Sequence, residues 1–590
     1  MNNLSKVFKI SILIFILIFS ITSVFSFVGC KQIEKIRKGF EERIGKEIEK
    51  EITLESTKIE EKYKSEYEQI LNLCLSEEPQ TIDPNLAESK ASIDLINQIF
   101  VGLTKFESDL SVSPCIAENW KISDDGTIIT FKIRDDAYWT NGDPITAHDF
   151  VYSWKRVLNP ETKSPFAYLF FDIEGAKEFH KGELDSNAVG IKAQNDTELE
   201  VKLRGPINYF TYITSIWITK PVPKSVVEKY KENWTNLNYL ITNGPFTIKN
   251  WEHHKKIVLE TNSDYFKGTP KLDIINIFLC KDQYTEFSMY KDDKIDGTWG
   301  WEFGIPSDLL KKIDSDPALR SQKLFEPRLS TYYLGFNTRN KPINNQLFRK
   351  AIALALDKNE LKNNPYWKTY IIANQFIPPQ ILEHDESIDI NFDLEKAKSF
   401  LFEALHQSGE SSNEKSIRTL KLMFSKSDKN RILAESTKEM LSENLNLKIE
   451  LIETDPESYF ETIHNINKYP QVTDMYLLES RADYPNPSNY LFTKLHSKSP
   501  LNYSGWKNDE FDELVTNAMI YDDLNKQAEL YNKASKIAFG DKNDEDRCPG
   551  EFPIIPLFYS SRNILIKPWV KGYWSNPFTG SYFYTTYIEK

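Results

Sequence analysis

Residues 139–154, WTNGDPITAHDFVYSW, are the stretch that decides the fold. Upstream, apolar and polar residues alternate over 129–133, which is the pattern of a strand with one buried face. The Asn-Gly pair at 141–142 predicts a turn, because both residue types tolerate a positive φ. Thr146 and Asp149 have the spacing of a helix capping box, and apolar residues follow at helical spacing. We therefore expect a strand, a turn and a capped helix, which carry no chemistry of their own.

This stretch resembles the signature of the extracytoplasmic solute-binding proteins of the peptide and nickel class, the binding components of oligopeptide ABC importers. The resemblance extends in the same order from about Leu71 to the C-terminus. Its other landmarks are a Gln80-Thr81-Ile82-Asp83-Pro84 run after a strand, a helix ending at Gly102-Leu103, an Asn243-Gly244-Pro245-Phe246 turn, and a strand over 332–338 followed by a helix that ends at Asp357.

The resemblance implies an α/β fold, the two-lobed periplasmic-binding-protein clamshell with mixed sheets and an extra inserted subdomain. Ligand would bind between the lobes and close them. A strand-helix-strand order over 420–452 also predicts a parallel strand pair. The expected domains are a discontinuous first lobe of residues 71–100, 223–330 and 562–590, an inserted subdomain of residues 101–222, and a second lobe of residues 331–561.

Length and charge set limits that do not depend on the resemblance. A chain of 590 residues is too long for one hydrophobic core and predicts two or more domains. The net charge of −13 argues against nucleic acid or anionic lipid as the main partner, because either needs a basic surface. We expect a monomer.

Residues 1–30 form a targeting segment, in which Lys6 and Lys9 precede an uncharged apolar run over 10–28. Residues 27–30, FVGC, resemble a bacterial lipobox, with Phe in place of the usual first Leu. The resemblance implies that Cys30 is acylated, with palmitate among its chains, and anchors a lipoprotein to the cell membrane, facing the periplasm or the cell exterior. An uncleaved anchor helix and plain secretion are the alternatives, because the apolar run could just span a bilayer.

Residues 31–70 form a charged tether. Lys, Glu and Ile dominate this segment, and it contains no Pro. Its apolar residues recur at steps of three or four, which predicts a narrow amphipathic helix. Because the stripe lasts under three heptads, we expect a partly helical tether rather than a stable coiled coil.

The remaining cysteines are Cys74, Cys115, Cys280 and Cys548. No CxxC pair occurs among them, which excludes the common zinc arrangements and a thioredoxin-like motif. Outside the cytoplasm they could form up to two disulfides, whose pairing the sequence does not reveal. The resemblance also implies that one disulfide of some peptide-binding relatives is absent, since Ser330 and Arg481 stand at its positions.

Enzyme activity has no support in the sequence. No His-Glu-x-x-His helix, Gly-x-Ser-x-Gly elbow, Walker A loop or Gly-x-Gly-x-x-Gly run occurs. The adjacent pair His253 and His254 lies on a predicted turn, where it is expected to be exposed to solvent rather than to bind a metal. We therefore expect no catalytic residue, no cofactor and no metal.

Residues 474–487 carry the predicted ligand recognition. They read as an apolar strand that enters a loop fixed by two prolines, so Asp483 lies just past a strand end, where ligands commonly bind. In the relatives that this stretch resembles, the matching Asp accepts the α-ammonium of the peptide. The alternative is a structural role, with Asp483 as a turn residue before Pro485.

Peptide binding also needs backbone partners. The resemblance implies that main chain at Glu479 and Arg481 on one lobe, and near Glu88 to Lys90 on the other, pairs with an extended peptide as an added strand. Some relatives hold the carboxylate of a short peptide with a basic residue six positions before the Asp, but Leu477 stands there. Aromatic residues at or near cleft positions of relatives, any of which could equally be core, are Phe166, Trp299, Trp301 and Tyr333.

Three hypotheses follow for the function. The first is a lipoprotein that binds oligopeptides and delivers them to the permease subunits of an ABC transporter. The second is a protein of the same fold that binds another solute, such as a nickel complex or an oligosaccharide. The third is a surface lipoprotein used for adhesion or sensing, which the long tether suggests.

Overall fold

The computed structural model describes residues 68–590, apart from 300–304, 365, 408–418, 522 and 545–548. The predicted signal segment with Cys30, the tether up to residue 67, and Trp301 lie outside the described residues. Residues Gln69–Lys590 form one compact unit. None of the described helices is long and apolar enough to cross a membrane.

The first strand of this unit lies inside a five-stranded sheet whose other members come from residues 246–298. The sheet order is β11 (Gly297–Thr298), β1 (Ile70–Leu75), β10 (Ile274–Leu279), β9 (Lys256–Thr261) and β8 (Phe246–Glu252). β1 runs parallel to both of its neighbours, whereas β8 and β9 form an antiparallel pair. The chain therefore leaves this sheet after β1 and returns to it some 170 residues later.

The strand, turn and helix predicted around residues 139–154 are confirmed as β5 (Ile128–Ile133), a turn and α4 (Ala147–Leu158). Of the two turn residues, Gly142 takes the positive φ, at 86°. The backbone N–H of Thr146 donates to the Asp149 carboxylate at 2.8 Å, which satisfies a donor at the helix start.

β5 belongs to a four-stranded antiparallel sheet on which α4 packs. Its order is β4 (Ala117–Ile122), β5, β7 (Glu198–Lys202) and β6 (Ile191–Asn195). The indole N–H of Trp154 on α4 donates to the Thr219 carbonyl at 2.8 Å, which ties the helix to the chain that leaves this segment.

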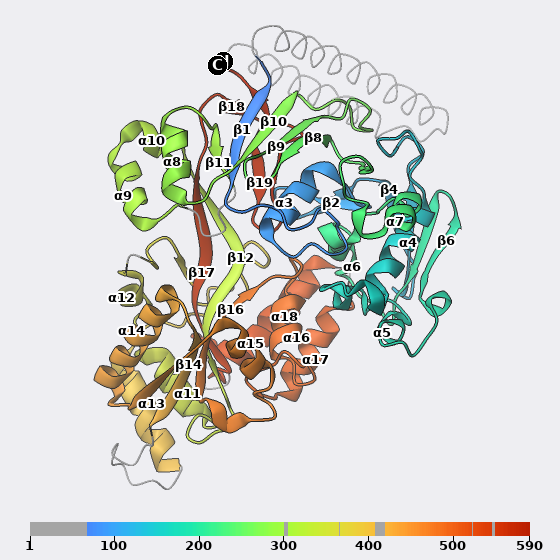
Figure 1. The fold of residues 1–590 in the computed structure, drawn as a ribbon. Coiled ribbons are helices and arrows are strands. Elements are labelled where there is room, and N and C mark those ends of the chain that lie inside the picture. Colours follow the sequence, from blue (N-terminus) through green and yellow to red (C-terminus); the bar gives the residue numbers. More distant parts are fainter. Residues whose placement is uncertain (1–67, 300–304, 365, 408–418, 522, 545–548) are drawn as a thin grey trace, which may run out of the picture. The chain divides into compact units, whose positions relative to one another are not determined.

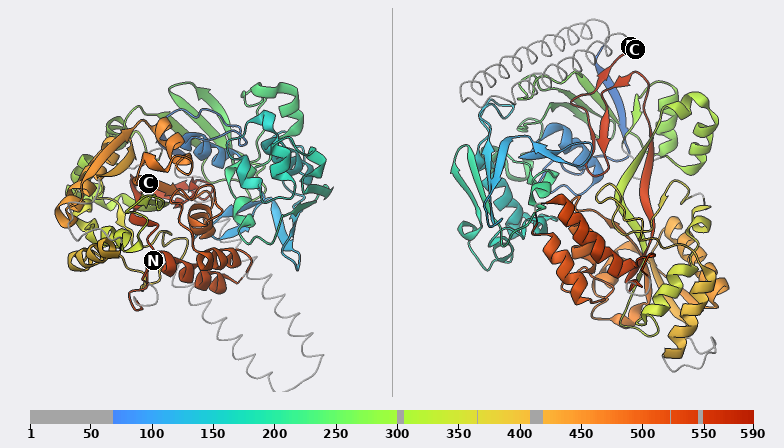
Figure 2. Two further views of the ribbon diagram at one scale, coloured as in Figure 1. Left: turned by 90° about the horizontal axis from the view of Figure 1, so that it is seen from below. Right: turned by 180° about the vertical axis from the view of Figure 1, so that it is seen from behind.

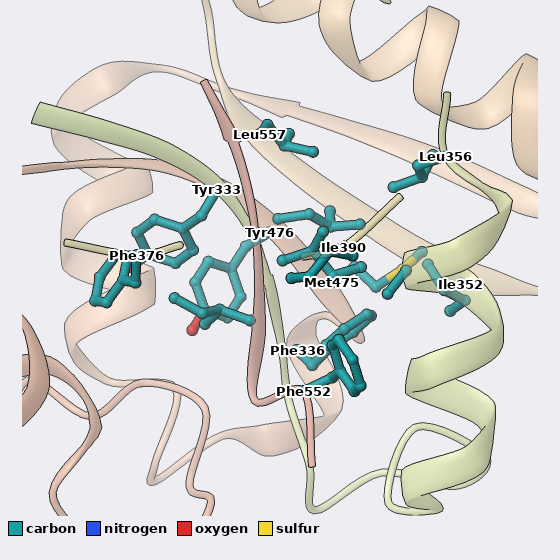
Figure 3. Packing of buried hydrophobic residues seen from close by; sticks show 14 of the residues in the cluster. Tyr333, Phe336, Ile352, Leu356, Phe376, Ile390, Met475, Tyr476, Phe552 and Leu557 are labelled. Atoms are coloured by element: carbon teal, nitrogen blue, oxygen red, sulfur yellow. The ribbon is translucent and has the colours of Figure 1, made fainter. Parts of the chain in front are cut away.

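A mixed six-stranded sheet lies in the later half of the chain. Its order is β13 (Ile371–Ile372), β17 (Ile554–Leu565), β12 (Lys323–Phe336), β16 (Met475–Arg481), β14 (Leu420–Ser425) and β15 (Ile449–Thr454). β14 and β15 are parallel and joined through α14 (Asp428–Leu445), as the sequence predicts. Side chains from β12, β16 and α11 (Gln346–Ala355) pack together between the sheet and its helices (Figure 3).

The other helices and strands complete the described part of the chain. The helices are α3 (Lys90–Ile99), α5 (Ala176–His180), α6 (Phe210–Ile213), α7 (Lys224–Tyr230), α8 (Gln283–Lys291), α9 (Ser307–Ser315), α10 (Pro317–Ser321), α12 (Lys358–Lys362), α13 (Leu394–Gln407), α15 (Pro456–His464), α16 (Ser488–Leu495), α17 (Asp509–Ala518) and α18 (Leu524–Phe539). The short strands are β2 (Thr104–Phe106), β3 (Val112–Pro114), β18 (Val570–Lys571), β19 (Trp574–Asn576), β20 (Gly580–Tyr582) and β21 (Tyr587–Ile588).

Two large hydrophobic cores divide this unit. One draws on residues 332–558, and the other on residues 71–299 with three later residues, Tyr484, Phe583 and Ile588. β12 and β17 are paired along most of their length and run from one core region to the other (Figure 1). Their register shifts between Pro327 and Thr331. The two lobes are thus joined by paired strands with an irregular point near their middle.

The C-terminal segment packs back onto the first lobe. The Gln69 side chain exchanges hydrogen bonds with the backbone of Ile588, at 3.0 and 2.9 Å. The Gln98 amide on α3 donates to the Ser581 carbonyl at 3.0 Å. These contacts agree with a discontinuous first lobe, although the predicted bounds at 330 and 561 fall inside β12 and β17 and remain a prediction.

One disulfide joins the described cysteines. Cys74 on β1 bonds to Cys280, just after β10, with a Cα–Cα distance of 5.9 Å. Cys115 is a buried free thiol, and Cys548 lies outside the described residues. The sequence left this pairing open, and the structure resolves it because β1 and β10 are neighbours in the sheet.

Candidate ligand-binding site

A cavity of about 540 Å³ lies beside the irregular point of β12 and β17. Its volume falls within the range of about 300–1,000 Å³ that is usual for small-molecule sites. Its walls come from residues 88–94 at the start of α3, 326–330 of β12, the end of β16, Arg562 of β17, and 576–580 of the β19–β20 hairpin. Three of the predicted site residues, Glu88, Lys90 and Arg481, line it.

Two ion pairs lie among the residues that line this cavity. Lys90 pairs with Asp94 one helical turn later, and Arg562 pairs with Glu326 at 2.5 Å. Burial lowers the pKa of Lys90 to about 8; Asp94 opposes this shift, whereas the charges of Arg562 and Arg328 add to it. The cavity therefore concentrates several charges in a partly dehydrated space, where each interaction is stronger than in water.

Glu479 lies under the cavity wall rather than in it. Its carboxylate accepts from Ser330 Oγ at 2.6 Å and Ser560 Oγ at 2.9 Å, and Arg481 approaches it at 3.4 Å. Burial acts to raise the pKa of Glu479, but the charges of Arg481 and Lys429 and these hydrogen bonds outweigh it and set the value at about 2. Glu479 thus stays ionised and fixes the end of β16 to β12 and β17.

β16 is paired with β12 along one edge and with β14 along only part of the other. Ser330 and Arg481 are direct cross-strand partners, so they stand opposite each other as the two disulfide positions of relatives must. On the other side of β16, the described pairing with β14 covers only Met475 and Tyr476. Among the described strands, none pairs with that edge of residues 478–480. This edge can accept an extended chain.

Asp483 follows directly, and its carboxylate is held on both oxygens. The Tyr168 hydroxyl donates to Oδ1 at 3.1 Å, and the Asn489 amide donates to Oδ2 at 3.2 Å. The Asn489 oxygen accepts in turn from the backbone N–H of Asp483 at 3.1 Å. Burial lowers the pKa of nearby Lys494, and the charge of Asp483 opposes this shift. Ala482 lines the cavity, whereas the next residue, Asp483, is not among its lining residues.

Beside Asp483, the segment around residues 207–210 contacts the second lobe. The Tyr209 and Tyr484 rings stack at 4.6 Å, 11° from parallel. The Asn208 amide donates to the carbonyls of Ala518 and Tyr521, at 2.9 and 2.8 Å. Figures 1 and 2 show α16–α18 beside this part of the chain from opposite sides. The contact is therefore broader than the single Tyr168–Asp483 hydrogen bond.

The predicted aromatic residues divide between the cavity region and the cores. Phe166 packs edge-on against Trp217, which lines the cavity, with ring centroids 5.2 Å apart. Trp299 is 2% exposed and Tyr333 4% exposed, and each belongs to a hydrophobic core in this structure. Trp301 lies outside the described residues.

Sequence reasoning missed several residues of the site. Trp217, Arg328, Arg562 and the 576–580 hairpin line the cavity, and Tyr168 contacts Asp483. Tyr168 lies only two residues after the predicted Phe166. Its hydroxyl-bearing aromatic side chain so close to a predicted cleft residue was the one sequence feature that could have indicated it. The hairpin is too far from α3 in sequence for any local pattern to place it there.

The His253 and His254 pair is exposed, as predicted. Their side chains are 74% and 88% exposed, and each places Nδ1 2.7 Å from the Glu78 carboxylate. Within the described part of the chain, no group of three His, Cys, Asp or Glu side chains is arranged to hold a metal ion.

Two lobes joined by paired strands, with a charged cavity and an open strand edge at the crossing, define a solute-binding protein of the extracytoplasmic type. The profile of the family described as "Bacterial extracellular solute-binding proteins, family 5 Middle" matches residues 111–502. The oligopeptide-binding protein OppA of Bacillus subtilis (strain 168) is 30% identical over 495 residues, which cover 83% of this chain and 87% of that protein. The chain therefore belongs to family 5 of the bacterial extracellular solute-binding proteins.

Solved structures agree with this assignment. The unliganded open form of the periplasmic murein tripeptide-binding protein MppA matches with a TM-score of 0.76 and 27% identity, over 88% of this chain and 97% of that one. Listeria monocytogenes OppA bound to peptide matches with a TM-score of 0.63 and 27% identity, over 89% of this chain and 99% of that one. The two-lobed fold predicted from the sequence is confirmed, and the chain is a binding protein rather than an enzyme.

Proposed function

We propose that this protein captures oligopeptides between its two lobes and delivers them to the permease subunits of an ABC transporter. The observation that carries the proposal is the edge of β16 over residues 478–480, which no described strand covers and which leads past the cavity into Asp483. An extended peptide offers the same N–H and C=O groups whatever its sequence, so this edge suits peptides of varied sequence.

The charges around this edge fit a peptide backbone with free ends. Asp483 offers a carboxylate to an α-ammonium, and Lys90, Arg328 and Arg481 supply positive charge near the cavity for a carboxylate. Glu88 and Lys90 would contact the peptide from the first lobe. Trp299 and Tyr333 would support the site from beneath, because both are buried. The names of the relatives, oligopeptide-binding and peptide-bound, support the same ligand class.

A survey by mass spectrometry of ligands that co-purify with the protein tests the proposal. We expect a mixture of short peptides of varied sequence. A single non-peptide solute, such as a nickel complex or an oligosaccharide, would instead support the second hypothesis. Peptide uptake that is unchanged after deletion of the gene would favour the adhesion or sensing role.

The proposal also covers the part of the chain outside the described residues. Acylation at Cys30 would anchor a lipoprotein to the membrane, and the tether over 31–70 would hold the lobes away from the bilayer. A monomer would suffice, because the cavity is built within one chain. The domain bounds given above, with residues 101–222 as the inserted subdomain, belong to the same proposal.

A further inference from the structure

The carboxylate of Asp483 is fixed by two donors from distant parts of the chain. Asn489, which is 1% exposed, belongs to α16 and bonds both the Oδ2 atom and the backbone N–H of Asp483. Tyr168 approaches from 315 residues earlier and donates to Oδ1 at 3.1 Å. The Asn489 contact alone holds one oxygen, whereas the second donor fixes the orientation of the whole carboxylate plane.

Tyr168 is itself positioned by an aromatic row that reaches the cavity wall. It lies in a short 3-10 turn, Ala167–Phe170, and its ring is 6.2 Å from that of Phe166. Phe166 packs on Trp217, whose indole N–H donates to the Ala87 carbonyl at 3.0 Å. Ala87 directly precedes the segment 88–94 that lines the cavity. Ring packing and one hydrogen bond therefore link Tyr168 to the predicted peptide-binding segment of the first lobe.

The hydroxyl of Tyr168 can act only as a neutral donor. Burial, and then the negative charge of Asp483, raise the pKa of this hydroxyl, so it keeps its proton at physiological pH. A neutral donor orients a carboxylate and leaves its negative charge in place. A lysine in the same position would cancel that charge. An ionised carboxylate offers about four lone-pair positions, so two donors leave room for an ammonium group.

We infer that Tyr168 is a positioning residue that holds the Asp483 carboxylate ready for the free α-ammonium of a peptide and so makes binding selective for unblocked N-termini. This inference rests on the proposed function. Stacking of Tyr209 on Tyr484 and the Asn208 hydrogen bonds hold these two parts of the chain against each other, so the Tyr168 hydroxyl stays within reach of the Asp483 carboxylate. Preorganisation of this kind lowers the entropy that binding must otherwise remove.

The test compares Tyr168→Phe with wild type by calorimetry. The probes are a synthetic copy of the most abundant peptide eluted from the purified protein and the same peptide with an acetylated N-terminus. The variant loses one hydrogen bond to a charged group, so we expect binding of the free peptide to weaken roughly tenfold and that of the acetylated peptide to stay within about twofold. The matched control is Tyr138→Phe, at another exposed tyrosine of the predicted inserted subdomain, and it should bind both peptides as wild type does.

Three other outcomes would overturn the inference. Equal weakening of both peptides would mean that Tyr168 only supports the local structure. Unchanged binding of both would mean that Asn489 orients the carboxylate without help. If no peptide elutes and wild type binds none, the proposed function fails, and this inference fails with it. Tyr168 is 44% exposed, so removal of its hydroxyl leaves the ring packing intact, and an unchanged melting temperature confirms that the variant is folded.

Discussion

Replacement of Asp483 by Ala gives the most informative change at the site. Asp483 comes two residues after the end of β16, the strand whose edge the proposed peptide would extend. If it pairs with the α-ammonium of a peptide, its removal leaves a cation without its partner in a closed cleft. We expect this loss to dominate the effect of the substitution.

The magnitude follows from the surroundings of the carboxylate. Breaking a buried ion pair costs about 3–5 kcal/mol. Asp483 is half-buried, so the lower end of this range applies. Since about 1.4 kcal/mol corresponds to a tenfold change in affinity, Asp483→Ala should weaken the free peptide roughly 100-fold. An acetylated peptide has no ammonium to pair, so it should lose no more than about threefold.

Calorimetry measures the affinity of wild type and Asp483→Ala for the free peptide and for the acetylated peptide. The control is Asp509→Ala, at an exposed aspartate in the first turn of α17 in the same lobe. Asp474 is not a suitable control, because it is 1% exposed and accepts from the Asn340 amide and the Lys421 backbone N–H, both at 2.9 Å. Free and acetylated peptides weakened by the same factor would refute the ammonium pairing and show that Asp483 shapes its loop.

Two further predictions concern stability and anchoring. The folded pKa of Glu479 is about 2, below its ordinary value of 4.5, so its ionised form stabilises the fold above pH 4.5 and this contribution is lost as pH falls through 2. Glu479→Gln should therefore cost up to about 3 kcal/mol at pH 7, and the gap to wild type in free energy of unfolding should narrow below pH 4.5; a gap that does not change with pH would contradict this. Cys30→Ala should abolish palmitate labelling and release the protein from membranes, and labelling at the wild-type level would rule out the lipid anchor.

Local pattern was enough to predict the elements around residues 139–154. The alternation over 129–133, the Gly at 142 and the Thr146–Asp149 pair all act within a few residues, and the structure confirms each. The parallel pair β14 and β15 was predictable for a related reason, because a strand, helix and strand in sequence leave few ways to pack.

Long-range contacts were not predictable from pattern. Cys74 and Cys280 are 206 residues apart, and only the placement of β1 beside β10 selects that pairing. An aromatic residue such as Trp299 or Tyr333 suits either a cleft wall or a hydrophobic core. The sequence does not distinguish these places, because the burial of each side chain depends on the three-dimensional fold. The Tyr168–Asp483 hydrogen bond spans 315 residues, so no periodicity in the sequence could have indicated it.

The cavity and the joint between the lobes share residues. Arg328, Leu329 and Ser330 line the cavity, and the same three residues lie within the register shift of β12 against β17. A ligand that contacts this wall therefore touches the segment that can bend most easily, since a bulge interrupts the ladder of hydrogen bonds. We expect this arrangement to couple occupation of the cavity to relative motion of the lobes.

Hydrogen exchange of the β16 amides tests the central claim most directly. If a peptide binds as an added strand, the backbone N–H groups of residues 478–480 that face away from β12 gain hydrogen-bond partners. Their exchange in the wild-type protein should slow on saturation with a peptide eluted from it, whereas amides of β15, two strands from β16 in the same sheet, should not change. Unchanged exchange at residues 478–480 under conditions where calorimetry shows binding would contradict the account.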